Sequence, residues 1–385
     1  MSEPLSSLDT PPTQRGDSPA AAVMNPPEIF AALSQDVIGQ EGTLRYVSVA
    51  IFKHIQGEPF GNLLMIGNSG TGKTTTMRAM ERLYSSTPAF ESYRVVIIIN
   101  ANVLANDEGT VDTTPLLHRL EERARQILGD GARPEDIARL MQHATVCIDE
   151  VDKISGVVGG RPFVTGINIQ QALLTMIEGE TLLYHLRGNG SGGGTAVEID
   201  SGRMLFLCAG AFETLYDQVF RRVISPKSGI KLPTTTTYED GKVQIREHFT
   251  LRDHFKLEDL FDYGMQPQFL SRFDNAIILD DLTPDVLRQI FLETRDSVFV
   301  RSKSFFRRYG IELEITEEAA HRIAREAAKH SRIGARALKT VFGTIIKPFE
   351  FDPFSRAEVA RQSAGRKLVI DKETVVRALH GELDA

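Results

Sequence analysis

The chain has 385 residues, of which 42% are hydrophobic and 25% are charged, and its formal net charge is −7. These values are ordinary for a globular protein, and the length allows two domains of about 100–200 residues each. The acidic balance argues against nucleic acid as a partner, because a general binder needs excess positive charge to displace counterions from phosphates. The two cysteines lie inside apolar runs, so we expect buried strand thiols and neither a disulfide framework nor a zinc site.

Residues 1–27 are rich in Pro, Ser, Ala and Thr and offer little to bury, so we expect a disordered leader. Its first residues, MSEPLSSLDT, have neither a basic start nor an apolar segment and do not resemble a signal peptide. No apolar stretch approaches the roughly 18 residues of a membrane span. The sequence therefore predicts a cytoplasmic protein with no membrane partner.

Beyond the leader, short apolar runs alternate with stretches of helical spacing. Helices are predicted over Glu28–Leu33, Thr43–Ile55, Lys73–Leu83, Thr114–Leu128, Arg133–Met141 and Ile167–Glu178. Strands are predicted over Asn62–Ile66, Arg94–Ile99, Thr145–Ile148, Met204–Cys208 and Ala276–Leu279. The alternation predicts an α/β fold, in which a parallel five-stranded sheet carries helices on both faces.

Two polar segments interrupt this pattern. Near residue 282 the alternation of strands and helices gives way to mostly helical spacing. We expect 187–195 to be a flexible surface loop and 225–247 to be a long insertion without periodicity. The later segments predict helices and short strands over Pro284–Arg301, Ile311–Ile315, Thr316–Lys329, Ala335–Ile346 and Lys367–Ile370. We therefore predict a large domain over 28–281 and a small, mostly helical α+β domain over 282–385.

The segment Gly67–Thr74, GNSGTGKT, directly follows a predicted strand and has the G-x-x-x-x-G-K-T spacing of a phosphate-binding loop. Glycines let successive backbone N–H groups face one anion, and the next helix directs the positive end of its dipole there. A Gly-rich turn that matches by chance is the alternative, and the strand–loop–helix context favours ATP. The predicted ATP-binding residues of this loop are Gly67, Asn68, Ser69, Gly70, Thr71, Gly72, Lys73, Thr74 and Thr75.

The run ATVCIDEVDKI places the acidic pair Asp149 and Glu150 at the end of another predicted strand. Asp149, with the hydroxyl of Thr74, is predicted to hold Mg²⁺, and Glu150 to act as the general base that polarises water. The alternative is that two acidic residues merely end a strand. Their position downstream of a phosphate loop favours a nucleotide hydrolase.

Six motifs in one order carry a resemblance to a known family. They are Gly67–Thr74, Cys147–Ser155, Gln170–Gly179 (QQALLTMIEG), Met204–Phe212 (MLFLCAGAF), Gln266–Phe273 (QPQFLSRF) and Ile333–Val341 (IGARALKTV). Together they resemble AAA+ ATPases of the Clp/HslU clade and, within it, the ClpX subunits of the Clp protease. The resemblance covers residues from about 27 to about 380.

The resemblance implies roles for residues outside the phosphate loop. Val37 and Ile38, in DVIGQ, match the family's adenine-contacting box, although a core-packed pair is the alternative. Arg272 matches the arginine that reaches into the neighbouring subunit's site, and Arg336 matches one that projects from the small domain onto the γ-phosphate. An arginine acting in trans implies a ring, which the family closes as a hexamer. Cys208–Gly210, at the sensor position, offers no polar side chain and is assigned no role.

Several positions depart from the family's pattern. Thr110 stands where the family has an aromatic residue that grips substrate in the pore, and Phe163, in a second pore loop, could compensate or simply pack under a loop. The basic substrate loop is replaced by Leu186–Asn189 and glycines. Ile230–Leu232 keeps two apolar anchors for docking on a peptidase ring, with Lys231 between them. The cysteines of the zinc-binding N-terminal domain are absent.

The resulting expectation is an ATP-hydrolysing ring motor that remodels or unfolds protein substrates, with delivery to a peptidase left open. The alternative is a nucleotide-gated assembly or regulatory switch that binds a dedicated partner without threading it, which the missing pore aromatic favours. A DNA-remodelling motor is disfavoured by the acidic balance and the lack of a basic stripe.

Overall fold

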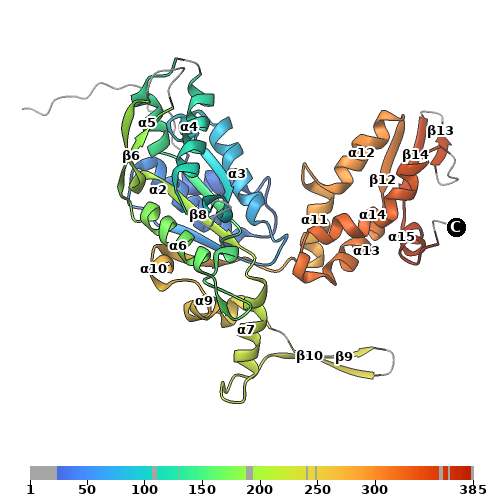
Figure 1. The fold of residues 1–385 in the computed structure, drawn as a ribbon. Coiled ribbons are helices and arrows are strands. Elements are labelled where there is room, and N and C mark those ends of the chain that lie inside the picture. The colour runs from blue at the N-terminus through green and yellow to red at the C-terminus, as the bar shows by residue number, and fades with distance from the viewer. Residues whose placement is uncertain are drawn as a thin grey trace, which may run out of the picture.

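A computed structural model describes residues 24–105, 111–129, 131–187, 194–239, 242–247, 249–354, 359–362 and 365–382. Figure 1 shows an α/β body, coloured blue to yellow, beside a smaller, mostly helical body coloured orange to red. Most of the predicted leader, Thr110 and most of the Gly-rich loop lie outside the described residues.

The larger body is built on a parallel sheet of five strands. In chain order these are β1 (Asn62–Ile66), β2 (Val96–Asn100), β3 (Thr145–Asp149), β8 (Leu205–Gly210) and β11 (Phe273–Ile278). Their order across the sheet is β11-β1-β8-β3-β2, and every pairing is parallel. The predicted fold class is therefore confirmed, with each strand displaced by no more than a few residues.

Helices cover both faces of this sheet, because its strands are apolar on both sides. In β1, Leu64 and Ile66 join one buried cluster while Leu63 and Met65 join the other, as strand alternation requires. The helices are α1 (Pro26–Leu33), α2 (Glu41–Gln56), α3 (Lys73–Ser86), α4 (Thr114–Leu128), α5 (Pro134–Gln142), α6 (Val164–Ile177), α7 (Glu213–Ile224), α8 (Leu251–His254), α9 (Leu257–Tyr263) and α10 (Pro267–Leu270). Short 3₁₀ helices lie at Pro88–Tyr93, Ala101–Leu104, Val151–Ile154, Ser201–Arg203 and Ser331–Ile333.

The smaller body has a separate apolar core, which draws on residues between Leu287 and Ala378. Its elements are α11 (Pro284–Glu293), α12 (Val298–Arg308), β12 (Ile311–Ile315), α13 (Glu317–Ala328), α14 (Arg336–Phe351), β13 (Val359–Gln362), β14 (Gly365–Ile370) and α15 (Lys372–Leu379). A core of its own is what an independent domain requires. We keep 28–281 and 282–385 as the proposed domain division.

Three sequence-based expectations about elements were wrong. The predicted helix Pro284–Arg301 is two helices, because the chain leaves helical geometry after Glu293 and the Ser297 hydroxyl caps α12 by accepting from the Val300 N–H at 3.0 Å. The insertion 225–247 contains the antiparallel hairpin β9 (Thr234–Glu239) and β10 (Lys242–Glu247), consistent with its β-branched run TTTT. Helix α1 begins inside the predicted leader, at Pro26.

Two further hairpins were not foreseen. Strands β6 (Thr181–His185) and β7 (Ala196–Asp200) flank the Gly-rich segment, and the two-residue strands β4 (Val157–Val158) and β5 (Arg161–Pro162) precede α6. Figure 1 shows the β9–β10 hairpin projecting away from the rest of the body, to the right of α7. Within the described ranges, no helix is long and apolar enough to cross a membrane.

His54, on α2, makes the stability of the large domain depend on pH. Its ring is 2% exposed, packs edge-on against Phe60 and Tyr93, and donates from Nε2 to the Arg203 carbonyl at 2.9 Å. Burial lowers the pKa of His54 from 6.5 to about 4. Between these two pKa values, His54 binds a proton in the unfolded chain but not in the folded chain. The free energy of unfolding therefore falls as pH drops from 6.5 towards 4.

We expect the shifted pKa of His54 alone to lower the free energy of unfolding by about 2 kcal/mol when the pH falls from about 7.5 to about 5. His54→Gln keeps an N–H donor for Arg203 but cannot titrate, so it should unfold more easily at both pH values and lose that part of the pH dependence. Urea unfolding of both proteins, followed by circular dichroism, measures the difference. An equal pH dependence in both would contradict the assignment.

Candidate nucleotide site

The phosphate loop between β1 and α3 has the backbone that its glycines permit. Gly70 and Gly72 have φ values of +73° and +111°, a region that residues with a side chain avoid. A Cβ on Gly67 would lie 2.8 Å from Cβ of Leu279. Two of these glycines are thus required by the turn and the third by close packing against the chain after β11.

Lys73, the first residue of α3, is buried within this loop at 8% exposure. Its ammonium donates to the carbonyl oxygens of Gly67 and Asn68, at 2.5 and 2.8 Å. Burial lowers the pKa of Lys73 to about 8, an effect that the negative charges of Asp149 and Asp152 partly oppose. The loop thus holds a desolvated positive charge at its inner face, where an anionic phosphate would relieve the cost of burial.

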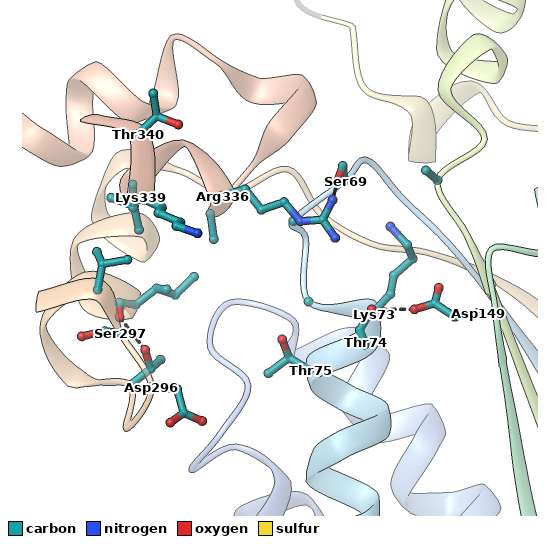
Figure 2. Close-up of a pocket in the computed structure, with 18 of the residues that line it drawn as sticks. Ser69, Lys73, Thr74, Thr75, Asp149, Asp296, Ser297, Arg336, Lys339 and Thr340 are labelled. Atoms are coloured by element: carbon teal, nitrogen blue, oxygen red, sulfur yellow. Dashed lines mark hydrogen bonds between the residues drawn. The ribbon is translucent and has the colours of Figure 1, made fainter. Parts of the chain in front are cut away.

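The two predicted magnesium ligands are in direct contact across the sheet. The Thr74 hydroxyl donates to Oδ2 of Asp149 at 2.6 Å, although the residues are 75 positions apart (Figure 2). Among the described residues, no group of three or more His, Cys, Asp or Glu side chains could hold a metal. One hydroxyl and one carboxylate suit Mg²⁺, which in nucleotide sites takes its other ligands from phosphates and water.

Glu150 follows Asp149 at the end of β3 and lines the same cavity. Its φ of +60° is in the left-handed region, as is that of Phe212 (+49°), which follows the neighbouring strand β8. These are the non-glycine residues with positive φ in the described part of the chain. Such backbone conformations are held in place by their surroundings and gather at functional sites. Here both occur just after the carboxyl ends of strands, beside the cavity.

Two adjoining cavities surround the phosphate loop. The first, of about 720 Å³, is lined by Lys73, Thr74, Asp149 and Glu150 together with residues of the smaller body. The second, of about 360 Å³, is lined on one side by Val37 and Ile38. The position beside the loop fits the adenine-contacting role predicted for this pair, and Val37 also belongs to the core. Both volumes are in the range of nucleotide-sized ligands.

The smaller body contributes directly to this site. Arg336, at the start of α14, donates from Nη1 to the Ser69 hydroxyl (Figure 2), and the Ala335 N–H donates to the Gly70 carbonyl at 3.1 Å. The structure therefore brings together the phosphate loop, the acidic pair and Arg336, three features predicted separately. An arginine at this place can neutralise phosphate oxygens.

Sequence reasoning missed several charged and polar side chains that line the first cavity. They are Asp152, Lys153, Glu213, Asp296, Ser297, Arg301, Lys339 and Thr340. Lys339 was within reach of prediction, because it lies three residues after Arg336 and so on the same helix face. Asp152, shortly after β3, and Glu213, shortly after β8, add negative charge near Lys73.

Arg272 is the one predicted catalytic residue that does not line either cavity. It precedes β11, whose first residue Phe273 pairs with Asn62 at the beginning of β1. The phosphate loop begins after the other end of β1, and a five-residue strand spans roughly 16 Å. Arg272 instead forms an ion pair with Glu178. Its position excludes direct contact with its own subunit's phosphate loop in this conformation.

A parallel sheet with a glycine-rich phosphate loop after one strand and an acidic pair after another defines a P-loop ATPase. The family model of the AAA domain (Cdc48 subfamily) matches residues 58–276. The ATP-dependent Clp protease ATP-binding subunit ClpX 3 of Methylococcus capsulatus is 30% identical over 92% of this chain and 80% of its own length. ClpX of Azotobacter vinelandii and ClpX 2 of Wolinella succinogenes are each 28% identical, over 91% and 90% of this chain and 81% and 82% of theirs.

The chain therefore belongs to the AAA family and is a ClpX-like AAA+ ATPase. The resemblance expected from the six sequence motifs is confirmed. It spans both bodies of the structure, since the aligned relatives cover about nine-tenths of the chain.

Glu150→Gln tests the general base. The amide keeps the shape of the side chain but cannot accept a proton, so we expect ATP to bind as in the wild type while kcat falls by at least about 100-fold. Glu213→Gln is the matched control, because it neutralises another carboxylate that lines the same cavity. Steady-state ATPase assays and equilibrium binding of a fluorescent ATP analogue measure the two effects. Equal losses in both variants would remove Glu150 from the base role.

Proposed function

We propose that the chain is the subunit of a ring-forming, ATP-driven motor that remodels or unfolds protein substrates. The contact that supports this most is the one between Arg336 and the phosphate loop, because it joins the smaller body to the loop that would hold the phosphates. Loss of the terminal phosphate would remove a partner of that arginine and change the angle between the two bodies. The relatives' names, which describe ATP-binding subunits of a protease, support the same function.

Within one subunit we assign each side chain a role. Val37 and Ile38 contact the base, the loop from Gly67 to Thr75 binds the phosphates, and Lys73 neutralises their charge. Thr74 and Asp149 would hold Mg²⁺, which supplies charge neutralisation at the phosphates when bound. Glu150 orients and deprotonates the attacking water.

Arg272 completes the site from the neighbouring subunit in this proposal. It lies near the opposite end of β1 from its own subunit's phosphate loop, so it does not serve that loop and is available to another copy. A head-to-tail contact that uses two different surfaces closes into a ring when the rotation between copies closes. We propose a hexamer, by analogy with the ClpX family.

The surface that grips the substrate is proposed to be the β4–β5 hairpin. Val157 and Val158 on its first strand are 44% and 58% exposed. The hairpin is nevertheless held firmly, because the Gly156 N–H donates to the Gly264 carbonyl at 2.7 Å and the Ser155 hydroxyl to the Tyr263 carbonyl at 2.8 Å. Phe163 is half-buried beside Gly166 on α6, so it has less surface to offer a substrate.

Docking on a peptidase ring stays a proposal for the Ile230–Leu232 segment. Ile230 is 43% exposed, whereas Leu232 packs against the core of the large body. One exposed anchor favours a weaker contact than two would give. The switch without threading remains the second candidate, and Thr110 in place of a pore aromatic is the observation that favours it.

Unfolding of a tagged, folded fluorescent reporter with ATP distinguishes the two candidates. We expect wild-type protein to abolish the reporter's fluorescence, and the double change Val157→Ser and Val158→Ser to lower that rate at least about tenfold while ATPase activity is kept, because apolar grip is lost. Val369→Ser, on the small body, is the control for an exposed valine. ATP hydrolysis without any loss of reporter fluorescence would favour the switch.

Subunit mixing tests the trans role of Arg272. Arg272→Ala should bind ATP but lose about 1000-fold in kcat, the scale of other arginine fingers. Lys73→Ala subunits have an inactive loop but an intact arginine, so mixed rings should recover hydrolysis at the Arg272→Ala sites. Arg139→Ala, which removes a surface arginine paired with Asp136 on α5, should behave as the wild type. No recovery in the mixture would place Arg272 outside the neighbour's site.

A further inference from the structure

The main chain of Arg272 is held by hydrogen bonds at the sheet. Only its side chain can therefore take different directions. The Arg272 carbonyl accepts from the Asn62 side chain at 3.3 Å, and its N–H donates to the Phe269 carbonyl at 3.2 Å. The same Asn62 side chain accepts from the Phe206 N–H of β8 at 3.1 Å. Two strands of the sheet therefore hold the base of the arginine.

The guanidinium itself is held by Glu178 through an ion pair. The two side chains are 47% and 32% exposed, so their pairing adds little to folding stability. Its consequence is geometric. The contact joins Nη2 of Arg272 to one carboxylate oxygen of Glu178, so it restrains the direction of the side chain and leaves the other N–H groups of the guanidinium for phosphate oxygens.

Glu178 is itself well placed to hold a cation. It is the C-cap residue of α6, where the helix dipole is negative and a carboxylate is stabilised by a nearby positive charge. The middle of α6 is anchored by Gln170, which is fully buried. Its amide donates to the Ile154 carbonyl and accepts from the Gln266 N–H, both at 2.7 Å. Helix α6 is thus fixed both to the segment after the acidic pair and to the start of α10, which leads to Arg272.

We propose that Glu178 is the positioning residue for Arg272, and sets the direction in which this arginine is presented to the neighbouring subunit. The inference rests on the proposed trans role of Arg272. Glu178 touches no substrate in this arrangement and acts only through the guanidinium. Its loss should therefore damage the neighbour's site and leave its own subunit's site intact.

Glu178→Ala should lower kcat of the homomeric ring about 10- to 100-fold with an unchanged KM for ATP, because misplacing a catalytic group by about 1 Å has effects of that size. Glu178→Gln keeps an acceptor oxygen without the charge and should lose less. Glu180→Ala removes a nearby exposed carboxylate for which the described structure gives no ion pair, and should match the wild type.

Mixing with Lys73→Ala subunits distinguishes a positioning role from a merely structural one. A merely structural role of Glu178 would give no recovery of turnover in the mixture. Glu178→Ala subunits should regain turnover in the mixture, as Arg272→Ala subunits do, since the intact arginine comes from the partner. The double variant Glu178→Ala, Arg272→Ala should be no slower than Arg272→Ala alone, because the two residues act as a unit.

Each other result overturns the inference in a recognisable way. Wild-type turnover of Glu178→Ala would show that Arg272 needs no positioning by this carboxylate. A slow Glu178→Ala that is not rescued, in an experiment where Arg272→Ala is rescued, would show that Glu178 acts in its own subunit. If Arg272→Ala is not rescued either, the trans role proposed above fails, and the inference fails with it.

Discussion

The backbones of Gly70 and Gly334 pass so close to each other that neither position has room for a side chain. A Cβ on Gly334 would lie 2.8 Å from the carbonyl carbon of Gly70, and both residues have positive φ, at +50° and +73°. Gly70 belongs to the phosphate loop, whereas Gly334 comes two residues before Arg336. The approach of the two backbones therefore decides where the guanidinium lies relative to the phosphate loop. Side chains at this seam would hold the two bodies apart and remove the arginine from the site.

The same seam is supported on its other side by contacts that also use backbone groups. The buried Gln40 side chain donates to the Asp280 carbonyl at 2.8 Å and accepts from its N–H at 3.0 Å, where the chain leaves β11 for the smaller body. Asn68 of the phosphate loop donates to the Asp281 carboxylate at 3.0 Å. The loop that binds phosphate and the connection between the bodies thus share hydrogen bonds, and a change in one requires a change in the other.

The sequence was informative wherever a local pattern has a physical cause. Apolar runs located all five sheet strands, because parallel strands are buried on both faces, and the glycine spacing located the loop. It was less informative where one residue outweighs a pattern: Ser297 caps a new helix inside a stretch that reads as one amphipathic helix. Contacts such as that of Ser69 with Arg336, 267 positions apart, depend on how the two bodies pack, and only the family resemblance pointed to that arginine.

The placement of the two arginines gives the proposed ring its logic. Arg336 reaches the phosphate loop of its own subunit, so under the proposal one copy would have what it needs to bind a nucleotide. Arg272 is fixed near the far end of the same sheet and, in the proposed ring, serves the neighbouring copy, so a single copy would lack the second positive charge for the transition state. Under this proposal, binding would be a property of a single subunit and fast hydrolysis a property of a pair. Because a packed sheet moves as a unit, whatever tilts one subunit's sheet would, in the proposed ring, also move the arginine that it presents to the next subunit.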